Sequence, residues 1–222
     1  MSIPNKISPI KFDFGRLFII FIVIFLSCLV SITYIDKGLT IWVSENQPNQ
    51  IFRFFKSVTR LGKSDIWFLL VIGGLSCGLL LRKINFNGKS KFYGEWVAKS
   101  KHLLLSGLAL AIIVFALKIF FGRYRPYKFL DDNLYGFQFF QIDSAMLSFP
   151  SGHSATIFFI ATLFSHFLNN KKLTFFLLML ACIVAISRVA IFQHYFSDIV
   201  IGSYLGYAGG LITCFYLKDT SQ

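Results

Sequence analysis

Residues 103–121 of the chain read LLLSGLALAIIVFALKIFF. This run is almost entirely apolar and close to the ~20 residues that an α-helix needs to cross the hydrocarbon core of a bilayer. One cation, Lys118, interrupts it near its C-terminal end. The run therefore predicts a membrane-spanning helix that carries a charge close to one membrane face.

Five more windows of the chain are apolar enough to cross a membrane. They cover residues 17–35, 66–81, 155–168, 173–192 and 199–217. Composition agrees, because 55% of the 222 residues are hydrophobic and only 14% are charged, which is too apolar for an ordinary soluble domain. We therefore predict an all-α polytopic membrane protein, with six transmembrane helices in one bundle and residues 1–222 forming a single domain.

The net charge of +12 raises the alternative of a nucleic-acid-binding protein. However, the basic residues are dispersed, and no zinc-finger, helix-turn-helix or aromatic-basic pattern accompanies them. Cytoplasmic loops of membrane proteins are enriched in Lys and Arg. If both termini are cytoplasmic, the inner segments, including a basic loop at 82–102, hold 12 of the 22 basic residues but only three of the 10 acidic residues. We predict an N-in/C-in orientation and no nucleic-acid partner.

The connection at 36–65 contains Phe52, Phe55 and Val58 at helical spacing. This spacing predicts a short amphipathic helix, which either lies on the membrane surface or packs on the bundle. A second outer connection, 122–150, is rich in aromatic residues. These rings either line an entry for a lipid or anchor the chain at the membrane interface.

Three polar segments lie at ends of the predicted helices, where charges are costly and usually functional. They are KIFFGRYRP at 118–126, FPSGHS at 149–154 and SRVAIFQHYFSD at 187–198. Taken singly, Lys118 can snorkel, Arg125 can anchor at the interface and Asp198 can cap the last helix. The predicted orientation places all three segments on the outer face, which favours one shared site.

The cations of these segments suit a phosphate dianion, since guanidinium groups match phosphate oxygens and a lysine adds a point charge. Ser151 and Gly152 precede a helix, where a serine caps and free N–H groups attract an anion. We predict a phosphate-binding site formed by Lys118, Arg125, Ser151, Gly152 and Arg188.

Two histidines beside this site indicate acid–base or nucleophilic chemistry at phosphorus. His194 and Asp198 are four residues apart, so on a helix they share a face, and a carboxylate bound to one ring nitrogen leaves the other nitrogen as a directed lone pair. His194 is therefore the predicted nucleophile, Asp198 its orienting partner and His153 the acid for the leaving oxygen. Asp143 is a competing partner, because it could approach His153.

A metal site is the alternative interpretation of the same residues. His153, His194, Asp198 and Asp143 are possible ligands. The neighbouring cations would repel a divalent ion, and the sequence has no paired carboxylates of the kind that magnesium sites use. We predict neither a metal nor another cofactor.

These residues resemble the three signature motifs of the type 2 phosphatidic acid phosphatase family, which is related to bacterial acid phosphatases and vanadium haloperoxidases. The motifs lie within 118–198, and their residues are Lys118 with Arg125-Pro126, then Pro150-Ser151-Gly152-His153, then Ser187-Arg188 with His194 and Asp198. The resemblance implies a metal-independent phosphoric monoester hydrolase. By the same resemblance, His194 forms a phosphohistidine, Asp198 orients it, His153 protonates the leaving group, and water then releases phosphate.

Within that family, the compact length and the short loop between the first two motifs resemble the lipid A phosphatases of bacterial inner membranes. The resemblance implies a lipid phosphate substrate in the bilayer and a site that faces the periplasm, with the 4′-phosphate of lipid A placed ahead of the 1-phosphate. Undecaprenyl pyrophosphate, phosphatidylglycerol phosphate and phosphatidic acid are alternative substrates. A phosphotransferase and, from another class, an anion transporter are alternative functions, although the sequence lacks the inverted repeat typical of transporters. The oligomeric state stays open.

Overall fold

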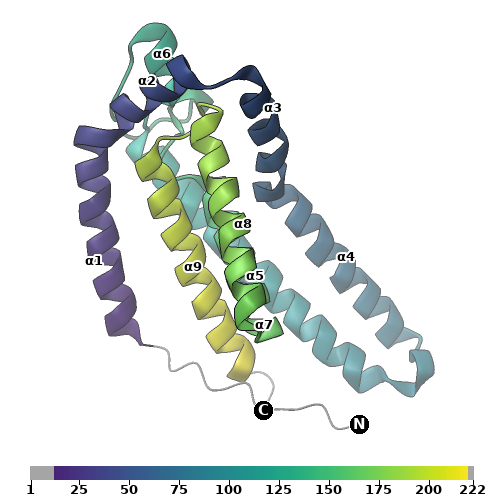
Figure 1. Cartoon of the computed structure of the whole chain (residues 1–222). Helices are drawn as coiled ribbons and strands as arrows, with labels where there is room; N and C mark the ends of the chain where they lie inside the picture. Colours follow the sequence, from purple (N-terminus) through teal and green to yellow (C-terminus); the bar gives the residue numbers. More distant parts are fainter. Residues whose placement is uncertain (1–12, 220–222) are drawn as a thin grey trace.

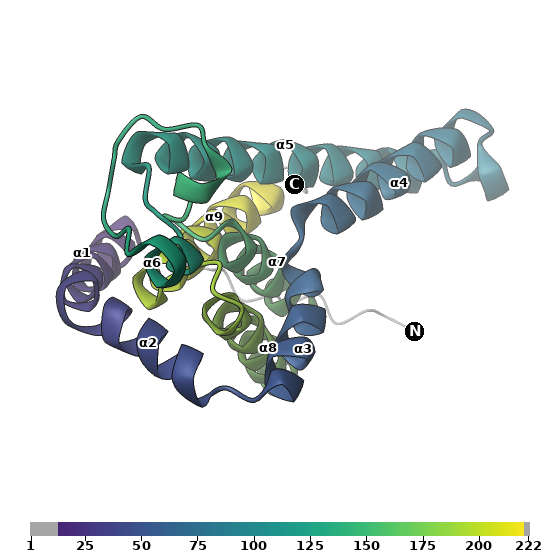
Figure 2. The same ribbon diagram turned by 90° about the horizontal axis from the view of Figure 1, so that it is seen from above.

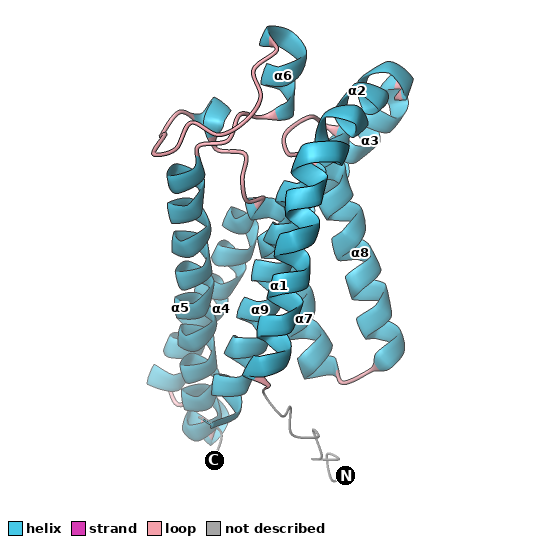
Figure 3. Ribbon diagram, turned by 90° about the vertical axis from the view of Figure 1, so that its left-hand side faces the viewer, coloured by secondary structure: helices cyan, strands magenta, loops and turns pink. Residues whose placement is uncertain are grey.

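The computed structural model describes residues 13–219, and this part of the chain is built from helices without a β-strand (Figures 1 and 3). The prediction of an all-α fold is confirmed. The long helices run side by side as a bundle. They are α1 (Phe14–Val30), α4 (Ser64–Lys83), α5 (Ser90–Phe121), α7 (Gly152–Leu168), α8 (Lys171–Ala190) and α9 (Phe196–Asp219).

Five helical stretches are long and apolar enough to cross a membrane, and α7 is a shorter apolar helix. The five stretches are Phe14–Asn46, Asn49–Lys83, Ser90–Phe121, Lys171–Ala190 and Phe196–Leu217. Large apolar side chains such as Leu105 and Ile112 are exposed on their outer faces, which suits contact with lipid. The chain is therefore a polytopic membrane protein, while the count of six spans and the N-in/C-in orientation stay predictions.

The segment 82–102 is mostly helical, so the expectation of a basic loop over these residues was wrong. α4 continues to Lys83 and α5 begins at Ser90, and only a short turn joins them. Lys, Arg and Glu have high helix propensity, so the two helices extend into the polar residues. The resulting α4–α5 hairpin leans away from the other helices (Figure 2).

The closest helix pairing is that of α7 with α9. Gly202, Gly206 and Gly210 follow each other at four-residue intervals on α9 and face α7. A Cβ atom on Gly202 or Gly206 would collide with the backbone oxygen of Ser151 or Ala155. Small residues at this spacing allow close backbone approach in membrane helices. The pairing fixes the start of α7 against the first turns of α9.

Short helices cover the end of the bundle where the polar segments lie (Figures 1 and 2). A π-helical turn, Ser31–Ile35 (η1), joins α1 to α2 (Asp36–Asn46), which is followed by α3 (Asn49–Val58) and the 3-10 turn η2 (Thr59–Gly62). Phe52, Phe55 and Val58 are half-buried, and α3 packs against α8. The predicted amphipathic helix therefore exists and packs on the bundle.

Candidate active site

The three polar segments meet at one end of the bundle. α5 ends at Phe121 and is capped by Gly122, whose positive φ of 55° allows the chain to turn toward the loop that contains Arg123 and Arg125. The Ser151 N–H donates to the backbone oxygen of Asp198 at 3.0 Å, which joins the second segment to the third. Lys118 Nζ donates to the Leu147 carbonyl at 2.6 Å, which joins the first segment to the residues just before the second.

The predicted phosphate-binding arginines are held by neighbouring polar groups. Arg125 is half-buried, and its Nε and Nη1 atoms donate to the Ser144 carbonyl at 2.8 Å and to Gln193 Oε1 at 2.7 Å. Arg188 is buried, and its Nη1 donates to Thr59 Oγ1 at 2.9 Å. Within the described residues, Arg188 Nε is a buried donor without an acceptor. An unpaired buried donor is costly, so an anion that accepts from it would gain affinity.

Ser151 begins α7 as its N-cap residue. Its buried Oγ accepts from the Ser154 N–H at 3.4 Å, while its own N–H already bonds to Asp198. The first N–H groups of any α-helix have no acceptor within the helix. At this helix start, the N–H groups of Gly152 and His153 therefore remain for an anion, together with the positive end of the helix dipole.

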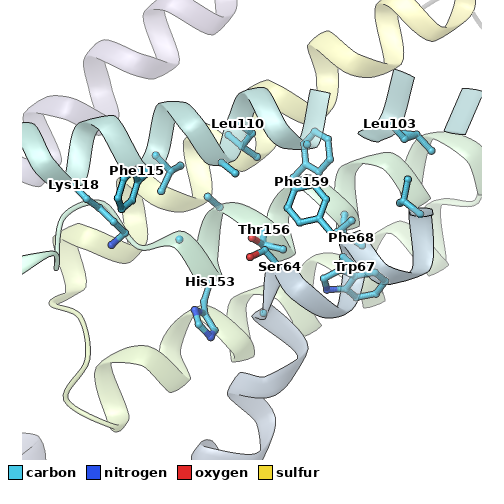
Figure 4. Close-up of a pocket in the computed structure, with 18 residues that line it drawn as sticks. Ser64, Trp67, Phe68, Leu103, Leu110, Phe115, Lys118, His153, Thr156 and Phe159 are labelled. Atoms are coloured by element: carbon cyan, nitrogen blue, oxygen red, sulfur yellow. The ribbon is translucent and has the colours of Figure 1, made fainter. Parts of the chain in front are cut away.

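His153 lies beside a cavity that it shares with Lys118 (Figure 4). The turn η2 covers the ring closely, since a Cβ atom on Gly62 would lie 3.1 Å from the ring atom His153 Cδ2. Asp143, the competing partner expected for His153, accepts from the Ala145 N–H at 2.9 Å and caps the turn Ser144–Met146. No ion pair between Asp143 and His153 exists in the described structure.

His194 is buried in the turn between α8 and α9. The expectation that His194 and Asp198 share a helix face was wrong, because α9 begins at Phe196 and His194 precedes it. The two side chains nevertheless approach each other, with 3.6 Å between His194 Nδ1 and Asp198 Oδ2. This distance exceeds a normal hydrogen bond, and in the described part of the chain Nδ1 has no other partner.

The pKa of His194 lies well below its ordinary value of 6.5. Burial is the main cause, and the positive charges of Lys118, Arg188 and Arg125 add to it, followed by His153. All four residues are therefore close enough to His194 to act on its charge. The lowered pKa keeps the imidazole neutral at neutral pH, which is the form that a nucleophile requires.

Asp198 is surrounded by partners that the motif reasoning did not include. Its Oδ1 accepts from Arg123 Nη1 at 2.5 Å, and its Oδ2 accepts from Ser148 Oγ at 2.6 Å and from the Tyr195 N–H at 2.8 Å. The bond to Tyr195 also caps α9, so Asp198 both caps the helix and approaches His194.

Arg123 bridges Asp198 to a second carboxylate, because its Nη2 donates to Asp36 Oδ2 at 2.7 Å. Ser197 Oγ also donates to Asp36 Oδ2, at 2.5 Å. Burial opposes the charge of Arg123, but Asp198 and Asp36 hold its pKa above the ordinary value. We refer to Asp36, Arg123, Ser197 and Asp198 as the buried charge cluster. Sequence reasoning missed Asp36, although a carboxylate directly after the apolar window 17–35 was a usable signal.

An apolar cavity of about 240 Å³ opens beside Lys118 and His153 and continues between α4, α5 and α7 (Figure 4). Its walls include Trp67, Phe68, Leu110, Phe115 and Phe159. None of the aromatic residues between 127 and 140 lines it. Phe137 instead packs on Phe121 and Phe149. This cavity therefore gives no support to the hypothesis that the 122–150 loop forms a lipid entry.

The bundle and its polar end define a class, namely a polytopic membrane protein with a cationic, two-histidine site next to an apolar cavity. The chain belongs to the PAP2 superfamily, whose family model matches residues 100–221. The matched region contains all three polar segments of the site, while Asp36 lies outside it. The family resemblance drawn from the motifs is confirmed.

Curated relatives are similar over part of their length. Lipid A 1-phosphatase of Rhizobium johnstonii is 29% identical over 138 residues, which are 61% of this chain and 54% of that protein. A putative phosphatidate phosphatase of Drosophila melanogaster is 33% identical over 87 residues, which are 34% of this chain and 23% of that protein. The chain thus spans at most about half the length of these two relatives.

Two solved structures share the fold. The crystal structure of LpxE from Aquifex aeolicus has a TM-score of 0.57 and 25% identity, and the match covers 80% of this chain and 93% of that chain. A PAP2-type phosphatidylglycerolphosphate phosphatase from Bacillus subtilis also has a TM-score of 0.57, covers 92% and 96% of the two chains, and is 18% identical. The latter similarity concerns the fold alone.

Proposed function

We propose that this chain is an integral-membrane lipid phosphatase that hydrolyses a phosphate monoester of a membrane lipid. One observation carries the proposal: Lys118 and His153, which belong to the cationic site, also line the apolar cavity between α4, α5 and α7. A phosphorylated lipid has the same two parts, a dianionic headgroup and apolar chains. Membership of the PAP2 superfamily supports this assignment.

In the proposed reaction, Lys118, Arg125 and Arg188 hold the phosphoryl oxygens, and the start of α7 at Ser151 and Gly152 contributes helix N–H groups. These charges offset the negative charge that builds up on the oxygens in the transition state. The unpaired Nε of Arg188 is a suitable donor for one of them.

His194 then attacks phosphorus with Nε2, because Nδ1 faces Asp198. The P–N bond forms as the bond to the lipid oxygen breaks, and His153 gives its proton to the leaving oxygen. Burial and the nearby cations lower the pKa of His153 to about 3 in the free site, and a bound phosphate dianion offsets those cations, so that His153 carries this proton in the complex. In the second half, His153 takes a proton from water, the hydroxide attacks phosphorus, and the P–N bond breaks. Inorganic phosphate and free His194 result.

No step in this scheme uses a metal ion. Over residues 13–219, no group of three or more His, Cys, Asp or Glu side chains is placed to hold one. The cations around His194 would also disfavour a divalent ion. Metal independence stays a prediction, and a chelator tests it.

For the substrate, we propose a phosphate of lipid A, reached from the periplasmic side of the inner membrane. The sequence favoured the 4′-phosphate, whereas the name of the Rhizobium relative supports the 1-phosphate. We therefore propose the 1-phosphate first, and the 4′ position stays a prediction. Undecaprenyl pyrophosphate and glycerophospholipid phosphates are the competing substrates.

The test is phosphate release by the purified chain in lipid nanodiscs, with and without EDTA. The substrates are lipid A bisphosphate, undecaprenyl pyrophosphate, phosphatidylglycerol phosphate, phosphatidic acid and the soluble ester p-nitrophenyl phosphate. Mass spectrometry of the lipid products gives the position that is dephosphorylated. We expect EDTA-resistant release from lipid A. Absence of release from every lipid would contradict the proposal.

A cavity variant sharpens this test. Ala111→Trp places an indole in the cavity, whereas Ile112→Trp adds the same ring on the exposed, lipid-facing side of α5. We expect Ala111→Trp to raise KM for the lipid about tenfold or more, since a lost or blocked apolar contact costs 1–3 kcal/mol. Turnover of p-nitrophenyl phosphate should remain. Equal effects of the two variants would exclude the cavity as the lipid site.

A further inference from the structure

The buried charge cluster contains one cation and two anions. The side chains of Arg123, Asp36 and Asp198 are all fully buried. Buried charges are costly unless they are paired, and removing one partner of such a pair is strongly destabilising. Arg123 can neutralise only one of the two carboxylates. The cluster therefore carries one unit of negative charge in excess, and this excess calls for a positive partner.

His194 is the group that can balance this excess negative charge. Its Nδ1 lies 3.6 Å from Asp198 Oδ2, and it becomes positively charged when it carries a proton or a phosphoryl group. The other groups that act on His194 are Lys118, Arg125, Arg188 and His153, and none of them is an anion. Asp198 is thus the anionic neighbour of a histidine otherwise surrounded by cations.

The geometry of the cluster also fixes the direction of the Asp198 carboxylate. Arg123 occupies Oδ1, while Ser148 Oγ and the Tyr195 N–H hold Oδ2. Oδ2 is the oxygen that approaches His194. The bridge from Arg123 therefore prevents the carboxylate from rotating away from the imidazole.

Asp36 has a separate effect, which is electrostatic. If it were absent, Arg123 would neutralise Asp198, and the charge that faces His194 would be lost. Asp36 is held for this task by Ser31 Oγ at 3.0 Å, Ser197 N–H at 3.1 Å and Ser197 Oγ. It begins α2, directly after the π-helical turn that bends the chain over the site.

We propose that Asp36 and Arg123 are positioning residues of the phosphatase reaction: Arg123 orients Asp198, and Asp36 offsets the charge of Arg123 so that Asp198 remains an anionic partner for His194. The proposal rests on the function proposed above. It gives a part in the chemistry to Asp36, which lies in the first candidate span and outside the residues that the family model matches.

The test compares Asp36→Asn with the double variant Asp36→Asn/Arg123→Gln, using lipid A bisphosphate in nanodiscs. The single variant removes the excess charge, so we expect kcat to fall about 10- to 100-fold, as for outer partners that orient a functional group. KM should change little, because the phosphate-binding cations are untouched. In the double variant the glutamine amide can still donate to Asp198 Oδ1 and keep its direction, while Asp198 regains one net negative charge, so kcat should exceed that of Asp36→Asn.

The pH profile is a second readout, and a purely structural role of Asp36 would leave it unchanged. With less negative charge nearby, His194 should hold a proton less tightly in Asp36→Asn, and the acid limb of kcat/KM should move to lower pH. Other titratable groups beside the cluster are Cys28, Tyr135 and Tyr195, which are the same in every variant. Glu45→Gln is the matched control, because it removes an equal charge from an exposed position of the same helix.

The outcomes separate the inference from the proposed function. If the wild-type chain releases no phosphate, the proposed function fails. If it does release phosphate, wild-type kcat and pH profile in Asp36→Asn overturn the inference, as does a double variant slower than the single one. Folding is followed by size-exclusion chromatography and thermal unfolding. If neither variant folds, the cluster serves folding alone and the inference is likewise overturned.

Discussion

At the scale of the residue, the proposed chemistry depends most on the protonation of His194. The imidazole is buried, and the positive charges of Lys118, Arg188 and Arg125 act on it, so its protonated form is disfavoured. A free imidazole with an ordinary pKa of ~6.5 would lose its nucleophilic lone pair progressively below that pH. In this site, His194 stays neutral to a lower pH.

The pH dependence of activity follows from this shift. A histidine with a lowered pKa protonates only when the pH falls below that pKa, so the acid limb of kcat/KM should lie below ~6.5. We would measure kcat/KM from about pH 4 to about pH 8. Ionisation of the substrate phosphate is followed separately by phosphorus NMR, and the pH profile of kcat/KM is corrected for it. An acid limb at or above the ordinary histidine value would contradict the assignment.

The sequence predicted which motif residues would meet, because the alternation of apolar windows and loops placed all three polar segments at one membrane face. It did not predict the partners of Asp198. The contact between Asp36 and Arg123 joins residues 87 positions apart, and no local spacing encodes such a contact. A buried charge in a membrane helix signals function, but its partner emerges only from the packed structure.

At the scale of the element, the pairing of α7 with α9 positions the site. It sets the start of α7, at Ser151 and His153, against the first turn of α9, which carries Asp198 and directly follows His194. The apolar windows were predictable because spans require long apolar runs. The glycine spacing on α9 was overlooked, since its meaning depends on which helix faces it. The extension of α5 beyond the predicted window depends on helix propensity rather than hydropathy.

We expect Gly206→Ala to separate α7 from α9, because the new methyl group would collide with backbone atoms of α7 that cannot rotate aside. Overpacking of this kind costs about 1–3 kcal/mol. The midpoint of thermal unfolding in detergent should fall, and phosphate release should fall with it, because the distance from His153 to His194 would change.

Gly73→Ala is the control for this prediction. Gly73 also lies inside a long helix, α4, but nothing lies within 4 Å of a Cβ atom built on it. Alanine has a helix propensity higher than glycine by about 1 kcal/mol, so this variant should be as stable as the wild type or slightly more stable. A Gly206→Ala protein as stable as Gly73→Ala would show that the close pairing is unimportant.

At the scale of the whole molecule, the bundle combines an apolar exterior with a polar site at one end. The site collects residues from Asp36 to Asp198, so nearly every long helix contributes to it or supports it. The α4–α5 hairpin leans away from α7 and leaves the apolar cavity beside Lys118 and His153 (Figures 2 and 4). This arrangement lets a lipid present its phosphate to the site while its chains remain in an apolar environment.

The covalent state of the histidines during turnover tests directly whether His194 is the nucleophile. Wild-type chain, mixed with lipid A bisphosphate and quenched rapidly at alkaline pH, is digested and analysed by mass spectrometry. His153→Ala is analysed in parallel, and His166→Ala, at the opposite end of α7, is the control. We expect phosphate on His194. Phosphate on His153, or rapid release of phosphate by a His194→Ala variant, would contradict this expectation.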